Sequence, residues 1–415
     1  MFRARFPALF HRNFLIFWTG QFISLIGTWM QNTIQPYLAY SLTSQPIYLG
    51  LIGFAGSLPA LLLMLPGGVL VERVDKRKAV IFLQSVMMVQ AFLLAYLTLT
   101  GQVTIWHIIG LALVLGVANS IEITARQAML TDLVPKEAIP NAIALNSTVF
   151  NLARVLGPSL TAPFLIILKT QGEGWGFFAN GVSYLFVIIG LLFVTTRFIP
   201  GAGQAKRRLL QDFQEGQKYI RATPLVGILI LMVTIPGFFG FPAMQQIPVF
   251  ARDVLRVAGE SEAGVATRNS LIVTAQGAGA LIAALTLAVF SSMRRKGLAL
   301  MIGQFVFAAG LIGMALSRSL PLSLAAMVLV GWGTVTQLAL TNTLIQLVVP
   351  DNLRGRVIST YLWAMQGVAP FGSLFTGWLA QTFGAPAAVL AGGSIVLAAY
   401  TTFHIFRPSI RQATG

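Results

Sequence analysis

Long apolar runs alternate with short polar segments along all 415 residues of the chain. Each run has roughly 20 residues or more, the length that a helix needs to cross a bilayer. The runs are evenly apolar and do not alternate with period two, which excludes the strands of a membrane barrel. We therefore predict an all-α, polytopic membrane protein with twelve transmembrane helices. The predicted spans are 14–40, 47–71, 79–99, 104–130, 139–168, 176–196, 224–250, 268–291, 297–317, 321–347, 355–382 and 385–406.

Composition supports a membrane protein and changes how the charge is interpreted. The chain is 56% hydrophobic and only 10% charged, whereas a soluble domain carries about 25% charged residues. A net charge of +16 would suggest nucleic acid in a soluble protein, but here the cations lie in loops between spans. We therefore expect no nucleic-acid partner. The absence of cysteine excludes disulfides and thiol chemistry.

The loop cations also predict an orientation. If both termini are cytoplasmic, that side carries 21 of the 28 Lys and Arg residues and the outer side carries five. The remaining two, Arg126 and Arg154, lie inside predicted spans. Such a bias follows the positive-inside rule and predicts a multi-pass protein of a bacterial-type inner membrane. The first span is too long for the apolar region of a signal peptide.

Marks of an internal repeat divide the spans into two sets of six. Gly116 and the Val134-Pro135 pair recur in the second half, at one constant offset, as Gly331 and Val349-Pro350. We predict an N-terminal six-helix bundle over 1–199, a cytoplasmic linker over 200–222 and a C-terminal bundle over 223–415. The linker is interpreted as a solvated connection, with a regulatory role as the alternative. Two pseudo-symmetric halves around a central site are typical of secondary transporters.

One predicted span carries charges on a single face. Asn119, Glu122 and Arg126 have i, i+3, i+7 spacing and share a face of a helix. Ionisable groups inside a membrane span are costly and mark paired or functional sites. At the repeat offset the second half carries no charge: its counterparts are Thr334, Gln337 and Thr341.

Three interpretations of Glu122 follow from its neighbours. It forms a local i, i+4 pair with Arg126, or it pairs across helices with Arg154, or it is a protonation site. An apolar environment raises a carboxyl pKa and an adjacent arginine lowers it, so distances decide between these alternatives. Glu122, Arg126 and Arg154 are the predicted proton-coupling or substrate-charge residues.

Polar side chains also line one face of several other spans. The first span has an uninterrupted polar stripe at helical spacing, which is costly against lipid. We expect it to line a cavity, with hydrogen bonding between helices as the alternative. The predicted cavity-lining residues are Gln21, Gln31, Asn32, Gln35, Asn119, Asn151, Thr334, Gln337, Tyr361, Trp363 and Gln366.

In the loop between the second and third spans, a glycine, three apolar residues, an acid and an arginine precede basic residues. This pattern resembles the signature loop of the major facilitator superfamily, although Glu72 replaces the usual aspartate and Asp75 the usual glycine. The resemblance implies a cytoplasmic gate that latches the two halves together. The residues assigned to it are Gly68, Glu72, Arg73, Asp75, Arg77 and Asp132.

The Gly157-Pro158 pair resembles a motif of proton-antiporting members of this superfamily. The runs NFLIFWTGQFISLIGTWMQ, ARQAMLTDLVP and NSTVFNLARVLGP together resemble its efflux branch, which includes enterobactin exporters and macrolide or multidrug pumps. The resemblance implies export of an amphipathic, siderophore- or drug-like small molecule by alternating access, with proton antiport. The implied partners are this substrate, protons and the lipid bilayer, and we expect a monomer without cofactor.

Other classes of function fit less well. A lipid or lysolipid flippase of the same fold and an oligomeric channel remain alternatives. An enzyme would need a nucleophile–base pair or metal ligands, but His11, His107 and His404 lie far apart in the sequence, so we expect no metal site. The chain has no GxxxxGK[ST] motif for ATP.

Overall fold

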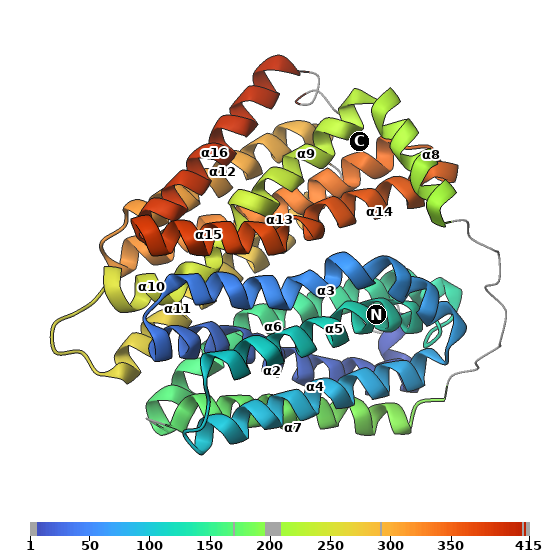
Figure 1. The fold of residues 1–415 in the computed structure, drawn as a ribbon. Coiled ribbons are helices and arrows are strands. Elements are labelled where there is room, and N and C mark those ends of the chain that lie inside the picture. Colours follow the sequence, from blue (N-terminus) through green and yellow to red (C-terminus); the bar gives the residue numbers. More distant parts are fainter. Residues whose placement is uncertain (1–5, 169–170, 196–208, 291–292, 409–410, 412–415) are drawn as a thin grey trace. The chain divides into compact units, whose positions relative to one another are not determined.

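The computed structural model describes residues 6–168, 171–195, 209–290, 293–408 and 411, with all side chains in these ranges except those of 64–70, 72, 73 and 209–213. Every element of secondary structure in these ranges is helical (Figure 1). The predicted all-α class is therefore confirmed.

The first half of the chain contains six long helices. They begin after a short 3₁₀ turn, and a second 3₁₀ turn, η2, precedes the fifth of them. The elements are η1 (Pro7–Phe10), α2 (Arg12–Thr43), α3 (Pro46–Arg73), α4 (Lys76–Leu99), α5 (Ile105–Leu130), η2 (Lys136–Ala138), α6 (Ile139–Leu168) and α7 (Gly172–Leu192).

The second half is less regular. Its first span is broken into α-, 3₁₀- and π-helical pieces, and its fifth is interrupted before Pro370. The elements are α8 (Leu209–Ala222), α9 (Pro224–Phe239), η4 (Phe241–Gln246), α10 (Ile247–Val249), η5 (Phe250–Val254), α11 (Glu262–Val289), α12 (Lys296–Leu316), α13 (Leu320–Val348), α14 (Asp351–Gly367), α15 (Ala369–Phe383) and α16 (Ala385–Phe406).

Ten of the predicted spans are confirmed as helices long and apolar enough to cross a membrane, within the part of the chain that the structure describes. The predicted spans 14–40 and 355–382 correspond to α2 and to the pair α14–α15. Helix α2 carries the polar stripe, and α14 and α15 are separate segments of 17 and 15 residues. The count of twelve spans therefore stays a prediction.

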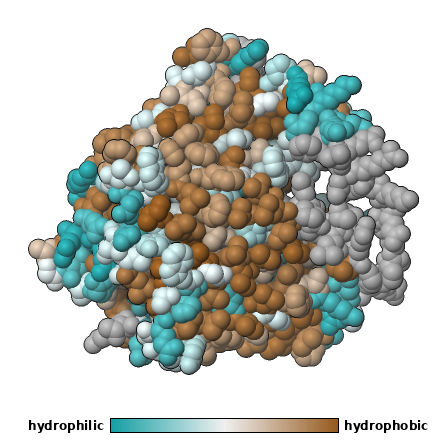
Figure 2. All heavy atoms as spheres, in the orientation of Figure 1, coloured by the Kyte–Doolittle hydropathy of each residue, from teal (hydrophilic) through white to brown (hydrophobic). Residues whose placement is uncertain are grey.

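The molecular surface is that of a multi-pass membrane protein. The face shown in Figure 2 is largely hydrophobic, and hydrophilic residues gather toward its edges. Large apolar side chains stand outside the core, among them Phe82 at 67% exposure and Ile167 at 74%. Contiguous exposed apolar surface of this kind requires a non-aqueous environment.

The chain groups into two compact units. One contains Met1–Thr43, Leu58–Gln204 and Ser261–Ser270, and the other contains Ser44–Ser57, Ala205–Glu260 and Leu271–Gly415. The units follow the predicted halves except that the beginnings of α3 and α11 are exchanged. The predicted boundaries at 199/200 and 222/223 stay predictions.

In the first unit, α2 packs against α6 and α7, and α4 packs against α5 and α7 (Figure 1). Gly157 on α6 lies directly against α2, where an added Cβ would come within 2.8 Å of the Ile26 carbonyl oxygen. Gly157 therefore permits close helix packing, as small residues do in membranes.

In the second unit, α12 packs against α13 and α16. Gly333 on α13 permits the closest part of the α12–α13 contact. A Cβ at this position would lie 2.6 Å from the Phe307 backbone nitrogen and 2.7 Å from the Gly303 carbonyl oxygen. Neither backbone atom moves without displacing α12.

This contact predicts a difference between two glycines of the same helix pair. We expect Gly333→Ala to lower the free energy of unfolding by about 1–3 kcal/mol, because the added methyl overpacks the interface. Gly313→Ala is the matched control, since its Cβ would meet only the Ala326 Cβ at 3.5 Å. Thermal unfolding of the detergent-purified protein measures both. Equal unfolding temperatures for the two variants would contradict the packing argument.

Candidate functional site

The centre of the candidate site is a buried ion pair on α5. Glu122 and Arg126 are 3% and 7% exposed, and the Arg126 Nε lies 3.2 and 3.3 Å from the two carboxylate oxygens of Glu122. Gln84 of α4 donates from its Nε2 to the Glu122 Oε1 at 3.0 Å. Of the three interpretations of Glu122, the local i, i+4 pair is the arrangement present here.

Burial explains why all three groups occur together. A lone carboxylate in an apolar bundle carries a large desolvation penalty, and the arginine one turn away neutralises it. The amide of Gln84 supplies a further donor and joins α4 to α5. The three side chains thus form a neutral, hydrogen-bonded group that the bundle can enclose.

The second half contains a corresponding group without charges. Gln337 on α13 stands at the repeat offset from Glu122, and Gln304 on α12 stands close to that offset from Gln84. The Tyr400 hydroxyl on α16 donates to the Gln337 Oε1, and the Gln304 Oε1 lies 2.8 Å from the His404 Nε2. Deep polar contacts therefore join helices in both halves, α4 to α5 in the first and α16 to α12 and α13 in the second.

Tyr400 itself has a counterpart in the first half. Tyr184 on α7 precedes it by nearly the same offset, is fully enclosed, and lies with its hydroxyl 3.3 Å from the Thr28 Oγ1 of α2. Sequence reasoning missed Gln84, Tyr184, Gln304 and Tyr400. The signal that would have found them is their pairing, Gln with Gln and Tyr with Tyr, at close to the offset that relates Gly116 to Gly331.

Arg154 occupies a different environment from the predicted one. Its guanidinium carbon lies 5.3 Å from the centre of the Trp29 ring on α2, a cation–π distance. The structure contains no ion pair or hydrogen bond of Arg154 among the residues it describes. The cross-helix pairing of Glu122 with Arg154 is thus not the arrangement found, and Arg154 holds a charge without a carboxylate partner in the described part.

The polar stripe of α2 is largely engaged by other helices. Gln31 is 1% exposed; its Nε2 donates to Gln90 and to Gln35, each at 3.2 Å, and Asn180 donates to its Oε1 at 2.7 Å. Gln31 therefore joins α2 to α4 and α7, and Gln35 supports it from one turn further along α2. Gln21 is buried with an unpartnered Oε1, whereas Asn32 is exposed.

The other predicted cavity-lining residues divide into exposed and buried sets. Asn119 and Trp363 are exposed, Asn151 and Gln366 are partly buried, and Thr334, Gln337 and Tyr361 are buried. Asn151 and Thr334 donate to carbonyl oxygens one turn earlier in their own helices, and the Tyr361 hydroxyl donates to Leu338 at 3.3 Å. Their assignment to a cavity stays a prediction.

The signature loop contacts helices of the first half. Asp75 caps α4 by accepting from the backbone nitrogens of Arg77 and Lys78, and Lys76 pairs with Asp132 at 2.7 Å. The Arg77 guanidinium donates to the last carbonyls of α7, at 2.6 Å for Leu191 and 3.0 Å for Leu192. The predicted gate role stays a prediction.

The rest of the predicted gate has no described side chains. The predicted gate residues whose side chains lie outside the described set are Gly68, Glu72 and Arg73.

One polar site in the second unit escaped sequence reasoning. Gln246, at the end of η4, is fully buried, and both atoms of its amide lack a hydrogen-bond partner among the described residues. Its neighbour Gln245 donates to the Ser373 hydroxyl at 3.2 Å. The only signal was a pair of glutamines between Pro242 and Pro248 in an otherwise apolar run. Such unsatisfied buried amides are unusual, and an ordered water or a ligand can satisfy them.

Comparison with known proteins agrees with this architecture. A family profile described as "transmembrane secretion effector" matches residues 4–413. The chain is 24% identical to the staphyloferrin A transporter of Staphylococcus aureus over 89% of each chain. It is 22% identical to macrolide efflux protein A of Streptococcus pyogenes over 93% of each.

The fold is also that of a solved transporter. A crystal structure of a nucleoside transporter superposes with a TM-score of 0.75 at 11% identity, covering 96% of this chain and 99% of the other. The major facilitator fold expected from the signature loop is confirmed.

The neutral pair predicts how two variants of α5 behave. We expect Arg126→Thr to lower the free energy of unfolding by about 3 kcal/mol, because it leaves the Glu122 carboxylate buried without its partner. The double variant Glu122→Gln with Arg126→Thr copies the residues that the second half carries at Gln337 and Thr341, and we expect it to recover most of this loss. Unfolding temperatures measured at neutral pH test whether the double variant is more stable than Arg126→Thr. A double variant less stable than Arg126→Thr would contradict it.

Proposed function

Because the chain belongs to the transmembrane secretion effector family of the major facilitator superfamily, we propose that it exports an amphipathic small molecule by alternating access. The family and the relatives are transporters rather than enzymes. The named substrates of the two relatives, a siderophore and a macrolide, support a siderophore- or drug-like substrate for this chain. We further propose that a monomer acts in a bacterial inner membrane with both termini cytoplasmic, which the loop cations support.

The energy source in this proposal is the proton gradient, and the observation that carries it is the buried Glu122. No other acid of the sequence lies deep within a predicted span. Its carboxylate accepts hydrogen bonds from Arg126 and Gln84. A proton binds when Arg126 withdraws its guanidinium, and it leaves when the pair forms again.

Two features support the proposed substrate class. Arg154 presents a cation beside the aromatic surface of Trp29, an arrangement that suits a substrate with an anionic group next to an apolar ring. In the second half, the unpartnered amide of Gln246 offers both a donor and an acceptor. Ligand sites combine apolar walls with a few such placed polar groups.

Glu122→Gln tests the coupling role. In liposomes with an imposed proton gradient, we expect it to abolish gradient-driven export while substrate counterflow continues without a gradient. The amide keeps the contact with Gln84 but cannot exchange a proton at neutral pH. Glu137→Gln is the matched control, because Glu137 is exposed beyond α5 and its loss should leave export unchanged.

A Glu122→Gln variant that still pumps substrate with full proton countermovement would sink the coupling role. Loss of both export and counterflow would assign Glu122 to substrate binding instead. Saturating transport of a fluorescent lysolipid, but not of dyes or macrolides, would favour the flippase alternative.

The proposed role of Arg154 in substrate recognition is tested by removing or keeping its charge. We expect Arg154→Leu to raise the KM for anionic substrates about tenfold, since charge-assisted hydrogen bonds to the guanidinium are lost. Arg154→Lys keeps the charge, and its KM for anionic substrates should lie between those of the unaltered protein and Arg154→Leu. The KM for cationic dyes is the internal control and should not rise. An equal rise for both substrate classes would remove Arg154 from substrate recognition.

A further inference from the structure

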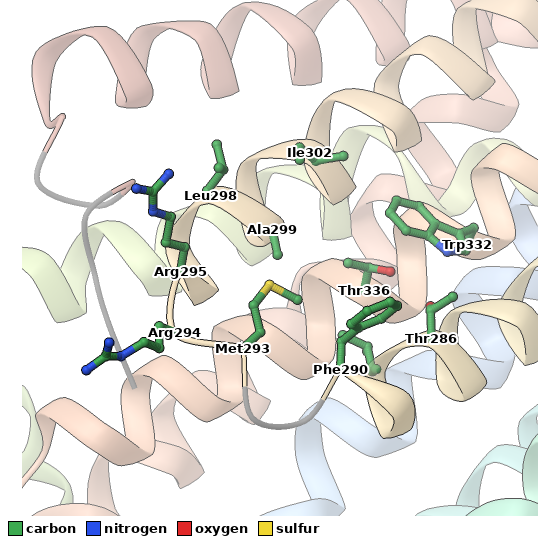
Figure 3. A pocket seen from close by; sticks show the side chains of 11 residues that line it. Thr286, Phe290, Met293, Arg294, Arg295, Leu298, Ala299, Ile302, Trp332 and Thr336 are labelled. Atoms are coloured by element: carbon green, nitrogen blue, oxygen red, sulfur yellow. The ribbon is translucent and has the colours of Figure 1, made fainter.

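A cavity of about 500 Å³ opens in the second unit between the end of α11, the beginning of α12 and the middle of α13. Its walls are apolar, with Phe290, Ile302 and Trp332 among the lining side chains. Two cations, Arg294 and Arg295, lie at its end, just before the beginning of α12 (Figure 3). Its volume is in the range of ligand-binding pockets, about 300–1,000 Å³.

The two arginines lack the partners that the matching loop of the first half provides. There, Asp75 caps α4, Lys76 pairs with Asp132, and Arg77 binds carbonyls of α7. Arg295 is the N-cap residue of α12, the place that Asp75 takes at the beginning of α4. No hydrogen bond or ion pair of either guanidinium is found within the residues that the structure describes.

The replacement of the capping acid also changes the beginning of α12. No side chain caps the first turn of this helix, whereas Asp75 accepts two backbone N–H groups at the equivalent end of α4. The beginning of a helix favours negative charge. The end of the cavity near Arg294 and Arg295 therefore combines two guanidinium groups with an uncapped helix beginning.

Inside the cavity, one polar atom has no partner. Thr336 is 2% exposed, lines the cavity, and its Oγ1 has no hydrogen-bond partner within the described structure (Figure 3). Two residues earlier, Thr334 donates in the usual way to the Val330 carbonyl. The Thr336 hydroxyl is thus available to an oxygen of a molecule that occupies the cavity.

We propose that this cavity binds an anionic phospholipid of the surrounding membrane. The phosphate lies against Arg294 and Arg295, the Thr336 hydroxyl donates to an ester carbonyl, and one acyl chain fills the apolar slot beside Ile302 and Trp332. Arginine is suited to bidentate contacts with phosphate. The loop cations predict that this end faces the cytoplasmic leaflet, where anionic lipids gather at basic pockets between helices.

Other occupants fit the same groups less completely. A free phosphate would satisfy the arginines and leave the apolar walls uncovered. A zwitterionic phospholipid fills the slot but brings an ammonium group toward two guanidinium groups. An anionic lipid matches both the charge at one end and the apolar length of the cavity.

Lipid binding to the purified full-length protein tests the proposal. Native mass spectrometry compares phosphatidylglycerol with phosphatidylethanolamine of the same acyl chains, and inorganic phosphate serves as a headgroup-only probe. We expect Arg294→Gln with Arg295→Gln to weaken phosphatidylglycerol binding about tenfold. Ala299→Phe, which fills the slot, should abolish it. Thr336→Val should weaken it about threefold.

A charge-matched control separates the site from general attraction to anionic lipid. Arg12→Gln with Arg407→Gln removes two exposed arginines from helix ends outside the cavity, and its phosphatidylglycerol binding should match the unaltered protein. Unfolding temperatures confirm that each variant is folded. Equal losses in both double variants would overturn the proposal, as would equal binding of the two lipids or displacement by inorganic phosphate alone.

Displacement of the lipid by a transported substrate would also overturn the proposal, because the cavity would then belong to the transport path.

Discussion

The first half of the chain depends on one constraint: a carboxylate inside an apolar bundle needs a neutralising partner close by. Glu122 meets it through Arg126, one turn away on the same helix, and through Gln84 on α4. An ion pair within one helix moves with that helix. A rigid movement of α5 therefore leaves the pair intact, and the proposed coupling depends on a change in the Arg126 side chain rather than on a separation of helices.

The repeated half shows what the fold itself needs at this depth. Gln337 and Tyr400 form a hydrogen bond between α13 and α16, and Gln304 binds His404 between α12 and α16. Uncharged groups therefore suffice to join these helices. The second half has Gln337 and Thr341 at the positions of the carboxylate and guanidinium, which is our reason for proposing a role in transport for Glu122 and Arg126.

Hydropathy alone predicted the all-α class and most of the spans, because a long apolar segment satisfies its backbone in a bilayer in only one regular way. The i, i+4 spacing of Glu122 and Arg126 likewise made their pairing one of the predicted arrangements. Partners on different helices could not be predicted, since Gln84 and Gln31 find theirs only when helices pack. Gln246 was missed because one amide barely changes the hydropathy of an apolar run, although its burial without a partner is conspicuous in three dimensions.

The two halves distribute charge in opposite ways. In the first, a charged pair lies deep in the bundle, while the loop cations Lys76 and Arg77 are compensated by Asp132 and by the end of α7. In the second, the deep contacts are neutral, and the loop arginines stand beside an apolar cavity without a carboxylate from the described chain. Because duplicated scaffolds share their packing requirements, these differences point to a division of labour. In our proposals, the first half exchanges protons and the second half binds an anionic lipid.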